Sequence, residues 1–473
     1  MLKEFVAKKI LAHFPFDASA EQLKLVDELS VFITSHETHS LFLLKGYAGT
    51  GKTSVISALI RLYDEMKQQV ILLAPTGRAA KVLASHANKN AQTIHKKIYR
   101  QKNISERFFQ LNQNLHKHTL FIVDEASMIN NIGGEDSIFG NGCLLDDLIQ
   151  YVYEGEGCRL LLMGDDAQLP PVNENYSPAL EKTKLESYGL NVLTFLLTEV
   201  LRQSKESGVL KNATLLRKAI SDNTLSTNPR FKLDSFTDIE RIDGEILLEK
   251  IENAYRSPGI ENTIVITRSN KRAEIYNQGI RNRILQREEE IASGDLLMVV
   301  KNNYFYGKEY PELQFIANGD IIRIKRINRY YKLYDFRFAD ITIQLLDYDI
   351  ELDVRILIDS LHADNPSAMK AMNERLFNSV TEDYADIGNK RERMKKIAEN
   401  EFYNALQLKF AYAITCHKAQ GGEWDTVFID QGAIAEEKTT GIDYYRWLYT
   451  AITRTSKKLY LVNFPDVFFD KFS

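Results

Sequence analysis

The sequence predicts an α/β protein with two domains, each built on a parallel β-sheet. In both halves of the chain, short apolar runs alternate with helical stretches, and such strands are typically buried on both faces of a sheet. The chain of 473 residues is also long for a single hydrophobic core. The predicted strands are 41–44, 70–73, 120–123 and 160–163 in the first half, and 263–267, 410–414, 426–429 and 459–462 in the second.

Three segments depart from this alternation. Between 294 and 358, apolar and polar residues alternate in several short runs, which predicts a small antiparallel barrel. Residues 365–405 are helical and charged, and we interpret them as a solvated surface arm. Residues 96–117 are polar and hold six basic residues against Glu106: Lys96, Lys97, Arg100, Lys102, Arg107 and Lys117.

Composition limits the classes of function only weakly. The net charge of −4 means that any nucleic-acid binding would need a local basic surface. The three cysteines, Cys143, Cys158 and Cys416, are far apart, which argues against a disulfide framework or structural zinc and suits a reducing cytoplasm. No apolar run approaches the roughly 18 residues of a membrane helix, and the first residues lack a secretory pattern. We therefore expect a cytoplasmic protein.

A Gly-rich loop between a strand and a helix predicts a nucleotide site. GYAGTGKT follows strand 41–44 and precedes a helix-compatible run, which is the context of a phosphate-binding loop. The glycines let backbone N–H groups approach phosphates, Lys52 adds a positive charge, and the Thr53 hydroxyl suits Mg²⁺. The alternative is a Gly-rich turn without a ligand. The predicted contacts are Gly46, Gly49, Thr50, Gly51, Lys52 and Thr53.

Two further strands end in polar side chains that suit nucleotide hydrolysis. LFIVDEAS ends in Asp124, a candidate Mg²⁺ ligand, and Glu125, which could polarise the attacking water. A strand ending in Asp-Glu is common on protein surfaces, but beside a phosphate loop it indicates nucleoside triphosphate hydrolysis. RLLLMGDDAQLPPV brings Gln168 to the predicted γ-phosphate position, in a turn that Pro170 and Pro171 also stiffen.

With these strands assigned, the chain resembles the superfamily 1 helicases, and more narrowly the RecD- and Dda-like 1B group. The resemblance covers nearly the whole chain, because the family motifs occur in order and at family spacing. APTGRAAKVL resembles motif Ia, TIH motif Ib, LTEVLRQ motif IV, ITCHKAQGGEWD motif V and YTAITRTSKKLYLV motif VI.

This resemblance implies that ATP and Mg²⁺ bind between two RecA-like domains. Gln22 corresponds to the family glutamine that reads adenine, and Glu423 to the acid that contacts the ribose. Arg202 and Arg454 correspond to the arginines that approach from the second domain and stabilise charge on the transferred phosphoryl group. Without the motif, a surface ion pair would be the ordinary interpretation of either arginine.

The resemblance also implies a path for single-stranded nucleic acid. Residues 96–117 correspond to a strand-separating pin, an interpretation that we weigh equally with a solvated basic loop. The barrel corresponds to an SH3-like domain, whose Tyr304, Phe305 and Tyr306 we assign to core packing or plain surface. Six residues correspond to family positions that contact the strand: Thr76, Arg78, His95, Asn270, Thr415 and His417.

The implied domains are 1–200 (RecA-like, 1A, carrying insertion 96–117), 201–293 with 406–473 (RecA-like, 2A) and 294–405 (barrel and helical arm, 2B). The implied function is an ATP-dependent DNA helicase that moves 5′ to 3′ on single-stranded DNA and unwinds duplexes. We expect single-stranded DNA and its junctions with duplex as partners, with RNA also open, no membrane, and a chain that can act as a monomer. The alternatives are an RNA helicase or nucleic acid–protein remodelling ATPase, a regulatory ATPase acting on a protein, and a small-molecule kinase.

Overall fold

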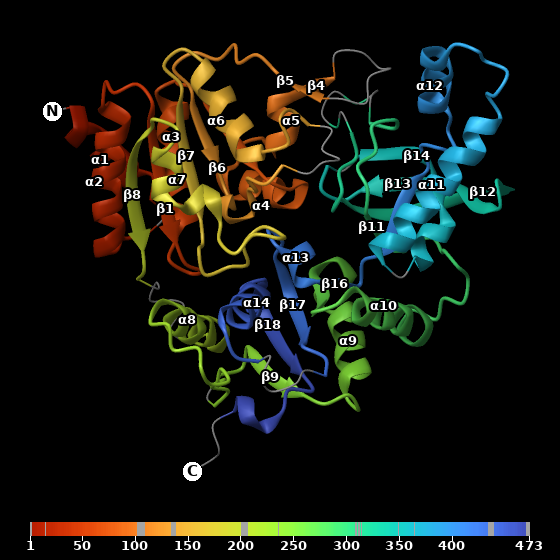
Figure 1. Ribbon diagram of the computed structural model, residues 1–473. Coiled ribbons are helices and arrows are strands. Elements are labelled where there is room, and N and C mark those ends of the chain that lie inside the picture. Colours follow the sequence, from red (N-terminus) through yellow and green to blue (C-terminus); the bar gives the residue numbers. More distant parts are fainter. Residues whose placement is uncertain are drawn as a thin grey trace.

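The chain forms two parallel sheets and a closed barrel (Figure 1). This confirms the predicted fold class of two RecA-like parallel-sheet units with a barrel insertion. Among the described residues, no helix has the length and apolarity needed to cross a membrane. The computed structural model describes residues 2–14, 16–101, 109–133, 139–199, 207–234, 236–307, 310, 313, 315–348, 350–363, 365–433 and 439–469.

The first sheet has six parallel strands in the order β3-β2-β6-β7-β1-β8. All four strands predicted for the first half of the chain are present in it. The two that the sequence did not reveal lie at the edges: β3 has only three residues, and β8 has mixed burial. The strands are β1 (Ser40–Gly46), β2 (Val70–Ala74), β3 (Ala91–Thr93), β6 (Leu120–Val123), β7 (Arg159–Gly164) and β8 (Asn191–Leu197).

Helices cover both faces of the first sheet and bury separate apolar cores. One core includes residues of the first four helices, and the other includes residues of the next three. The central strands are therefore buried on both sides, which explains their near-continuous apolar sequences. The helices are α1 (Leu2–Ala12), α2 (Ala20–Thr34), α3 (Lys52–Glu65), α4 (Gly77–Ala87), α5 (Ile94–Ile98), α6 (Leu144–Glu154) and α7 (Lys182–Glu186).

The second sheet has five parallel strands in the order β16-β10-β17-β18-β9 and lies below the first sheet in Figure 1. Its strands are β9 (Ile239–Ile242), β10 (Thr263–Thr267), β16 (Ala413–Thr415), β17 (Trp424–Asp430) and β18 (Thr455–Val462). Its helices are α8 (Gly208–Ser221), α9 (Leu247–Arg256), α10 (Asn270–Gly279), α13 (Cys416–Ala419) and α14 (Ile442–Ile452).

The barrel contains β11 (Leu296–Val299), β12 (Ile321–Leu333), β13 (Phe336–Leu345), β14 (Ile350–Leu357) and β15 (Leu406–Phe410). The last strand corrects two expectations. Residues 410–414 were predicted as one strand, but Phe410 ends β15 of the barrel and Ala413 begins β16 of the second sheet. Residues 406–410 were assigned to the second RecA-like domain, yet β15 closes the barrel by pairing with β11 and β14.

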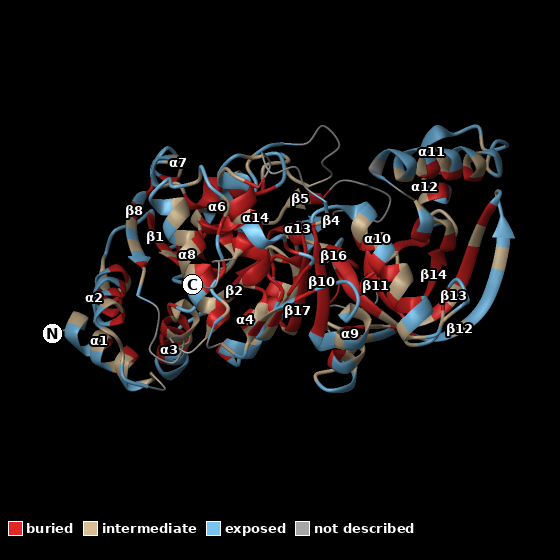
Figure 2. Ribbon diagram, turned by 90° about the horizontal axis from the view of Figure 1, so that it is seen from below, coloured by how far each residue is buried: buried red, intermediate tan, exposed pale blue. Residues whose placement is uncertain are grey.

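The helical segment packs on the barrel and is not simply a solvated arm, which corrects that interpretation. It consists of α11 (Pro366–Glu382) and α12 (Lys390–Glu399), and we keep the name arm for this pair. Figure 2 shows the arm beside β13 and β14, with most of its outer surface exposed. Apolar residues of both helices share one core with the barrel: Met372, Leu376, Val380 and Ile397 with Phe336, Phe338 and Leu357.

The basic insertion 96–117 contains a two-stranded antiparallel ribbon, β4 (Tyr99–Gln101) and β5 (Phe109–Leu111). Residues 102–108, with Lys102, Glu106 and Arg107, lie outside the described residues. Phe109 of the ribbon packs against Tyr304 of the barrel region, with ring centroids 4.5 Å apart. Lys96, expected in a polar and basic stretch, is only 4% exposed. The strand-separating role of the ribbon stays a prediction.

A buried ionic cluster joins the second domain to the barrel. Asp295, immediately before β11, is completely buried. Its carboxylate accepts hydrogen bonds from Arg281 Nη2 at 3.1 Å, Arg287 Nη1 at 2.5 Å and the Tyr412 hydroxyl at 2.7 Å. These partners come from the segment that follows α10 and from the link between β15 and β16. The cluster therefore fixes both connections between the barrel and the second sheet.

Replacing Asp295 by Asn should destabilise the protein strongly, because two arginines would lose their buried counter-ion. Breaking a buried ion pair on one side typically costs about 3–5 kcal/mol. We expect a clear fall in the thermal unfolding midpoint measured by scanning calorimetry. The control is Glu252→Gln, which removes the partner of Arg256 in an exposed pair on α9 and should cost less than about 0.5 kcal/mol. Equal midpoints for both variants would contradict a structural role for the cluster.

Candidate nucleotide site and interdomain cleft

The loop between β1 and α3 has the backbone conformation of a phosphate-binding loop. Gly49 and Gly51 have φ angles of 76° and 80°, a left-handed region that favours glycine. Helix α3 begins at Lys52, so its positive N-terminal end faces the loop. The Lys52 ammonium donates to the carbonyl oxygens of Gly46 and of Tyr47, the latter at 3.0 Å. The charge is therefore held inside the curve of the loop.

This loop opens into a cavity of about 430 Å³ between the first and second sheets. Residues of both domains line it. The predicted site residues on its wall are Gly49, Gly51, Lys52, Thr53, Asp124, Glu125, Gln168, Glu423 and Arg454. The structure therefore brings most of the predicted nucleotide and catalytic residues to one cleft.

Two neighbouring carboxylates enter this cleft where β6 ends. Asp124 accepts a hydrogen bond from the backbone N–H of Glu125 at 2.7 Å. Glu125 has a φ of 51°, which is uncommon for a residue other than glycine. This left-handed backbone conformation turns the chain sharply where the strand ends. Burial, and then the negative charge of Glu125, raise the pKa of Asp124 above its ordinary value.

The donor set fits Mg²⁺ held jointly with a nucleotide. The Asp124 carboxylate and the Thr53 hydroxyl line the same cavity, and hard cations prefer such oxygen ligands. The raised pKa of Asp124 reflects buried negative charge that a cation would offset. Within the described part of the chain, no group of three or more His, Cys, Asp or Glu residues could hold a metal ion by itself. Phosphate oxygens and water would therefore complete the coordination.

Gln168 lies just after β7 and lines the same cavity. It is 5% exposed, and its Oε1 has no hydrogen-bond partner among the described residues. Leaving a buried polar atom unpaired costs about 1–3 kcal/mol, so the site favours a polar ligand or water beside it. This agrees with the predicted position near the γ-phosphate.

Arg454, from the turn between α14 and β18, reaches the cleft from the second domain. Its Nη1 lies 3.6 Å from Glu125 Oε1, and its guanidinium also donates to the Thr450 carbonyl oxygen at 3.1 Å and the Gly422 carbonyl oxygen at 3.3 Å. These backbone contacts hold the guanidinium in place while leaving it close to Glu125. Arg202, the second predicted arginine, lies outside the described residues.

Tyr449 on α14 is a contact that sequence reasoning missed. Its hydroxyl donates to Asp165 Oδ2 at 2.5 Å and accepts the backbone N–H of Ala48 at 3.1 Å. Burial and Asp165 raise the pKa of Tyr449 well above its ordinary value, so the hydroxyl stays protonated. One side chain of the second domain therefore touches both the phosphate loop and the end of β7. The sequence marks Tyr449 only as the first residue of motif VI.

Two more hydrogen bonds hold the same segment of the first domain. The backbone N–H of Leu169 donates to the Thr450 hydroxyl at 2.8 Å, and its carbonyl oxygen accepts from Gln420 Nε2 at 2.7 Å. Residues 165–169 are therefore clasped by the second domain, and we call this set of contacts the 165–169 clasp. Gln168 lies within it.

Three predicted nucleotide contacts do not line the cleft. Gln22 is completely buried: its Oε1 accepts the Ser19 backbone N–H at 3.0 Å and its Nε2 donates to the Thr50 carbonyl oxygen at 3.3 Å. It therefore braces the phosphate loop, and adenine reading stays a prediction. Gly46 and Thr50 shape the loop: a Cβ on Gly46 would lie 2.9 Å from the Lys52 side chain, and the Thr50 hydroxyl donates to the Tyr47 carbonyl oxygen at 2.8 Å.

Two predicted strand contacts lie between the domains. Thr76 caps α4 by accepting the Ala79 N–H at 3.2 Å. The Arg78 guanidinium lies 3.8 Å from the centre of the Trp424 ring and donates to the Glu423 carbonyl oxygen at 3.4 Å. Arg78 thus connects α4 to β17, and a direct contact with nucleic acid stays a prediction.

His95 is packed against aromatic rings at the base of the ribbon. Its ring centroid lies 4.9 Å from that of Phe139 and 5.7 Å from that of Tyr99. Burial lowers the pKa of His95 to about 4, so its ring is neutral at pH 7. A contact with the strand would therefore use hydrogen bonding or stacking, without a positive charge.

The remaining strand candidates lie on another side of the second domain. Asn270 and Thr415 line a second cavity, of about 920 Å³, between α10, the barrel and α11. His417 is exposed and does not line that cavity.

Two parallel sheets, a phosphate loop on one and an arginine supplied by the other define a P-loop nucleotide-binding protein with two RecA-like domains. The family model of an AAA domain matches residues 17–228, and that of a UvrD-like helicase C-terminal domain matches residues 410–462. Together with the ordered helicase motifs, these matches support a superfamily 1B helicase.

The chain is also similar to several individual helicases. The ATP-dependent RecD2 DNA helicase of Deinococcus radiodurans is 30% identical over 41% of this chain, a match that spans 23% of that protein. The ATP-dependent DNA helicase dda of phage T4 is 24% identical over 82% of this chain and 86% of its own. A Bacteroides Pif1 helicase structure with ADP-AlF3 and ssDNA covers 96% of this chain and 95% of its own, with a TM-score of 0.48 and 16% identity.

Lys52→Ala should weaken nucleotide binding, because the variant loses the ammonium held inside the loop. A charge-assisted hydrogen bond is worth about 1.5–3 kcal/mol, and roughly 1.4 kcal/mol corresponds to tenfold in affinity. We expect at least a tenfold higher Kd for a fluorescent ADP analogue in an anisotropy titration. Lys67→Ala, at an exposed position after α3, is the control. Equal affinities would remove Lys52 from the site.

Proposed function

We propose that this protein is an ATP-dependent DNA helicase that moves 5′ to 3′ along single-stranded DNA and uses the hydrolysis energy to unwind duplex. The observation that carries the proposal is the 3.6 Å approach of Arg454 Nη1 to Glu125 Oε1, which joins the second domain to the hydrolytic centre of the first. The relatives named as DNA helicases support DNA as the substrate. The direction rests on the resemblance to the 1B group.

Each residue of the cleft has a role in the proposed hydrolysis. Lys52 binds the terminal phosphates, and Thr53 and Asp124 hold Mg²⁺, which offsets phosphate charge when bound. Glu125 orients the attacking water and accepts its proton. Gln168 hydrogen-bonds to that water or to the γ-phosphate, and Arg454 stabilises the charge that develops on the phosphoryl group. Arg202 is proposed to act beside Arg454.

The 165–169 clasp provides a route from hydrolysis to movement. Gln168 lies between Asp165 and Leu169, which bond to Tyr449 and Thr450 of the second domain. A change at the γ-phosphate that moves Gln168 therefore acts directly on α14. Opening and closing of the cleft around such a segment would move two strand-binding domains relative to each other.

The function is tested by steady-state ATP hydrolysis with and without single-stranded DNA, with single-stranded RNA in parallel. Strong stimulation by DNA supports the proposal, and unwinding of duplexes with a 5′ or a 3′ single-stranded tail then tests the direction. Stimulation by RNA alone would make the protein an RNA helicase or remodelling ATPase. No stimulation by either nucleic acid would contradict the proposal.

Glu125→Gln should trap the nucleotide, because the amide cannot accept the proton from water while Asp124 keeps its charge. We expect kcat for ATP hydrolysis to fall by about 10²–10⁴-fold, the usual contribution of a general base. The Kd for ATP, measured by equilibrium binding, should stay within about threefold of the wild-type value. This corresponds to a change in binding free energy of less than about 1.4 kcal/mol, which would be tenfold in Kd. Glu186→Gln, the same substitution at an exposed acid of α7 that pairs with Lys182, is the matched control and should keep normal turnover. Normal turnover in Glu125→Gln would exclude Glu125 as the base.

Arg454→Lys should impair hydrolysis far more than strand binding, since a lysine keeps one positive charge but loses the planar guanidinium. Arginines in this role are worth about 10³–10⁵ in rate. We expect kcat to fall by a comparable factor, while nucleotide-free binding of single-stranded DNA changes little. Arg241→Lys, which alters a surface pair with Asp466, is the control. A collapse of DNA affinity in Arg454→Lys would instead place this residue on the strand path.

A further inference from the structure

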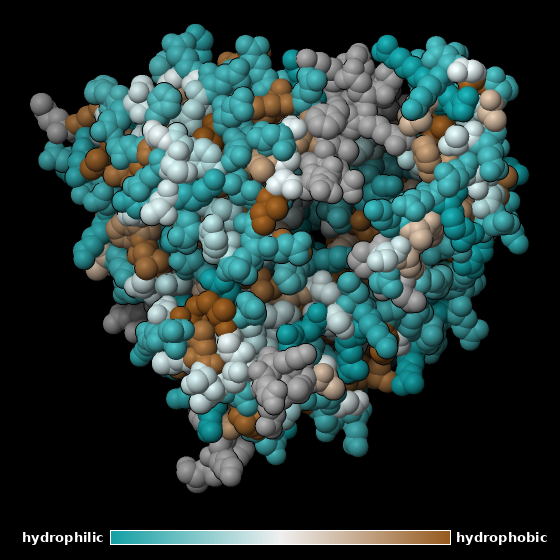
Figure 3. All heavy atoms as spheres, in the orientation of Figure 1, coloured by the Kyte–Doolittle hydropathy of each residue, from teal (hydrophilic) through white to brown (hydrophobic). Residues whose placement is uncertain are grey.

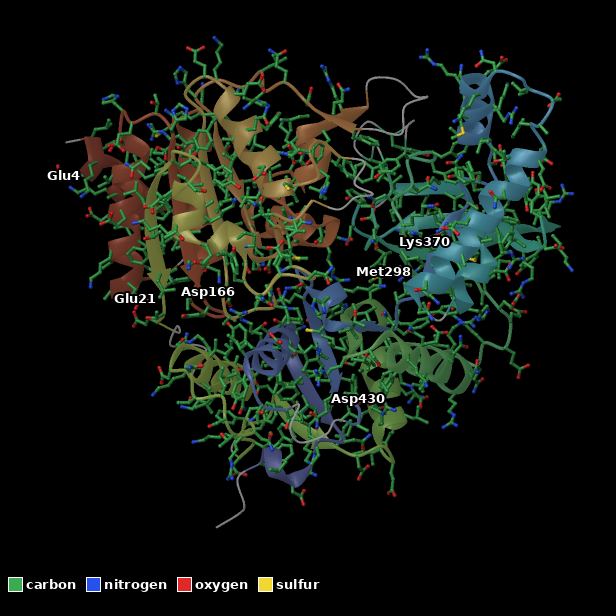
Figure 4. The ribbon with its side chains drawn as sticks, viewed as in Figure 1. Glu4, Glu21, Asp166, Met298, Lys370 and Asp430 are labelled. Carbon is green, nitrogen blue, oxygen red and sulfur yellow. The ribbon has the colours of Figure 1, made fainter. Side chains whose placement is uncertain are left out.

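The second cavity lies where three parts of the chain meet: α10 and β16 of the second domain, β11 and β15 of the barrel, and α11 of the arm. In Figure 3 the described residues of the visible face are mostly hydrophilic, with scattered hydrophobic patches. Figure 4 shows Lys370 of α11 close to Met298 of β11, above the second sheet that carries Asp430. The arm is therefore one wall of this cavity.

The charged residues of the cavity wall are mostly basic, although the whole chain has a net charge of −4. Among the described residues, no salt bridge involves Lys271, Lys370 or Lys418, so their charges can attract an anion. Burial lowers the pKa of Lys418, and the nearby positive charge of Lys409 lowers it further. The charged residues on the wall are Lys271, Lys301, Lys370, Lys409 and Lys418 against Glu274.

A buried amide on the same wall points independently to a ligand. Gln407 of β15 is 4% exposed, and its Oε1 has no partner among the described residues. Its Nε2 donates to Asn373 Oδ1 on α11, so the amide is held in one orientation. A buried acceptor without a donor favours a ligand that brings an N–H or O–H group, as nucleotide bases do.

The position of α11 is set by the barrel. Lys409 Nζ donates to the carbonyl oxygens of Leu361 and Ala363, at 2.7 Å each, and so fixes the segment that leads into the helix. Asn365 then caps α11 by accepting the Ala368 N–H at 2.8 Å. Residues 372, 376 and 380 pack on the barrel, 370 and 373 face the cavity, and 369 borders both. The two sets form adjoining stripes of one helix.

We propose that α11 of the arm binds the backbone of the single strand, with Lys370 contacting a phosphate opposite Asn270, Thr415 and Lys418 of the second domain. The proposal rests on the proposed function, because it needs a single strand to pass through this cavity. It assigns a role to a helical segment that has no helicase motif. The strand would then touch the second domain on one side and an extension of the barrel on the other.

Lys370→Gln should lower the affinity for single-stranded DNA, and it should make that affinity less dependent on salt concentration. Each phosphate contact on a single strand contributes about 0.7 to the slope of log K against log salt concentration. We expect that slope to become shallower by about 0.7, and the affinity near 100 mM salt to fall roughly three- to tenfold. The loss of affinity should be the same for oligo-dT and oligo-dA, because phosphate contacts carry no sequence information. Fluorescence anisotropy measures both quantities.

The matched control is Lys396→Gln, which removes an exposed lysine of the same arm on α12 that does not line the cavity. Both lysines are exposed, so neither change should alter the thermal midpoint. If Lys370→Gln keeps the affinity and slope of the control while the wild type binds DNA, the arm proposal is wrong and the helicase proposal stands. If the wild type binds neither DNA nor RNA, the proposed function itself fails.

A second measurement locates the strand directly. The wild-type protein is irradiated with an oligonucleotide that carries 4-thiothymidine, and the crosslinked peptides are identified by mass spectrometry. We expect crosslinks in α11 together with peptides that carry Asn270 or Thr415. Crosslinks confined to the two RecA-like domains would overturn the proposal that the arm contacts the strand.

Discussion

Much of the structure depends on the 165–169 clasp, because it joins the two RecA-like domains directly beside the nucleotide loop. The Tyr449 hydroxyl bonds to both Ala48 and Asp165, and burial raises the pKa of Asp165 to about 6. A carboxylate so far from water depends on its few hydrogen-bond partners. The relative position of the domains is therefore coupled to the geometry of the loop that binds phosphate.

A second contact, of a different kind, seats the barrel on the first domain. Lys96 Nζ lies 3.8 Å from the centre of the Tyr348 ring. Burial lowers the pKa of Lys96, and the negative charges of the nearby Asp320 and Asp347 partly oppose this shift. A Cβ on Gly77 would lie 2.7 Å from the Tyr348 hydroxyl, so only glycine allows α4 to approach this closely. The barrel therefore meets the helix that begins with motif Ia through a polar, tightly fitted contact.

The sequence predicted the elements that obey local rules and missed those that depend on distant pairing. The central strands, the phosphate loop and the acids after β6 follow from apolar runs and motif spacing. Strand β15 was misassigned because it pairs with β11 and β14 across the helical arm, and no local pattern shows that pairing. Tyr449 was missed for a similar reason: a tyrosine in a largely apolar helix suggests core packing until its hydroxyl is seen between the two domains. The burial of Lys96 depends on Tyr348 of the barrel region, and the packing of His95 depends on Tyr99 of the ribbon, so neither could be predicted locally.

The return of the chain from the arm into β15 also explains how the arm can take part in binding. An arm joined to the barrel only at one end could pivot. Binding a phosphate would then have to immobilise the whole arm, and this entropy cost would cancel most of the binding free energy that its lysine contributes. Here α11 is fixed at its start by Lys409, along its length by the core shared with Phe336 and Leu357, and beside the cavity by Gln407. Since Lys409 and Gln407 both belong to β15, the strand that closes the barrel is also the one that orients the arm. Any movement of the barrel relative to the second domain would therefore carry Lys301, Lys370 and Lys409 with it, widening or narrowing the space between these lysines and Thr415.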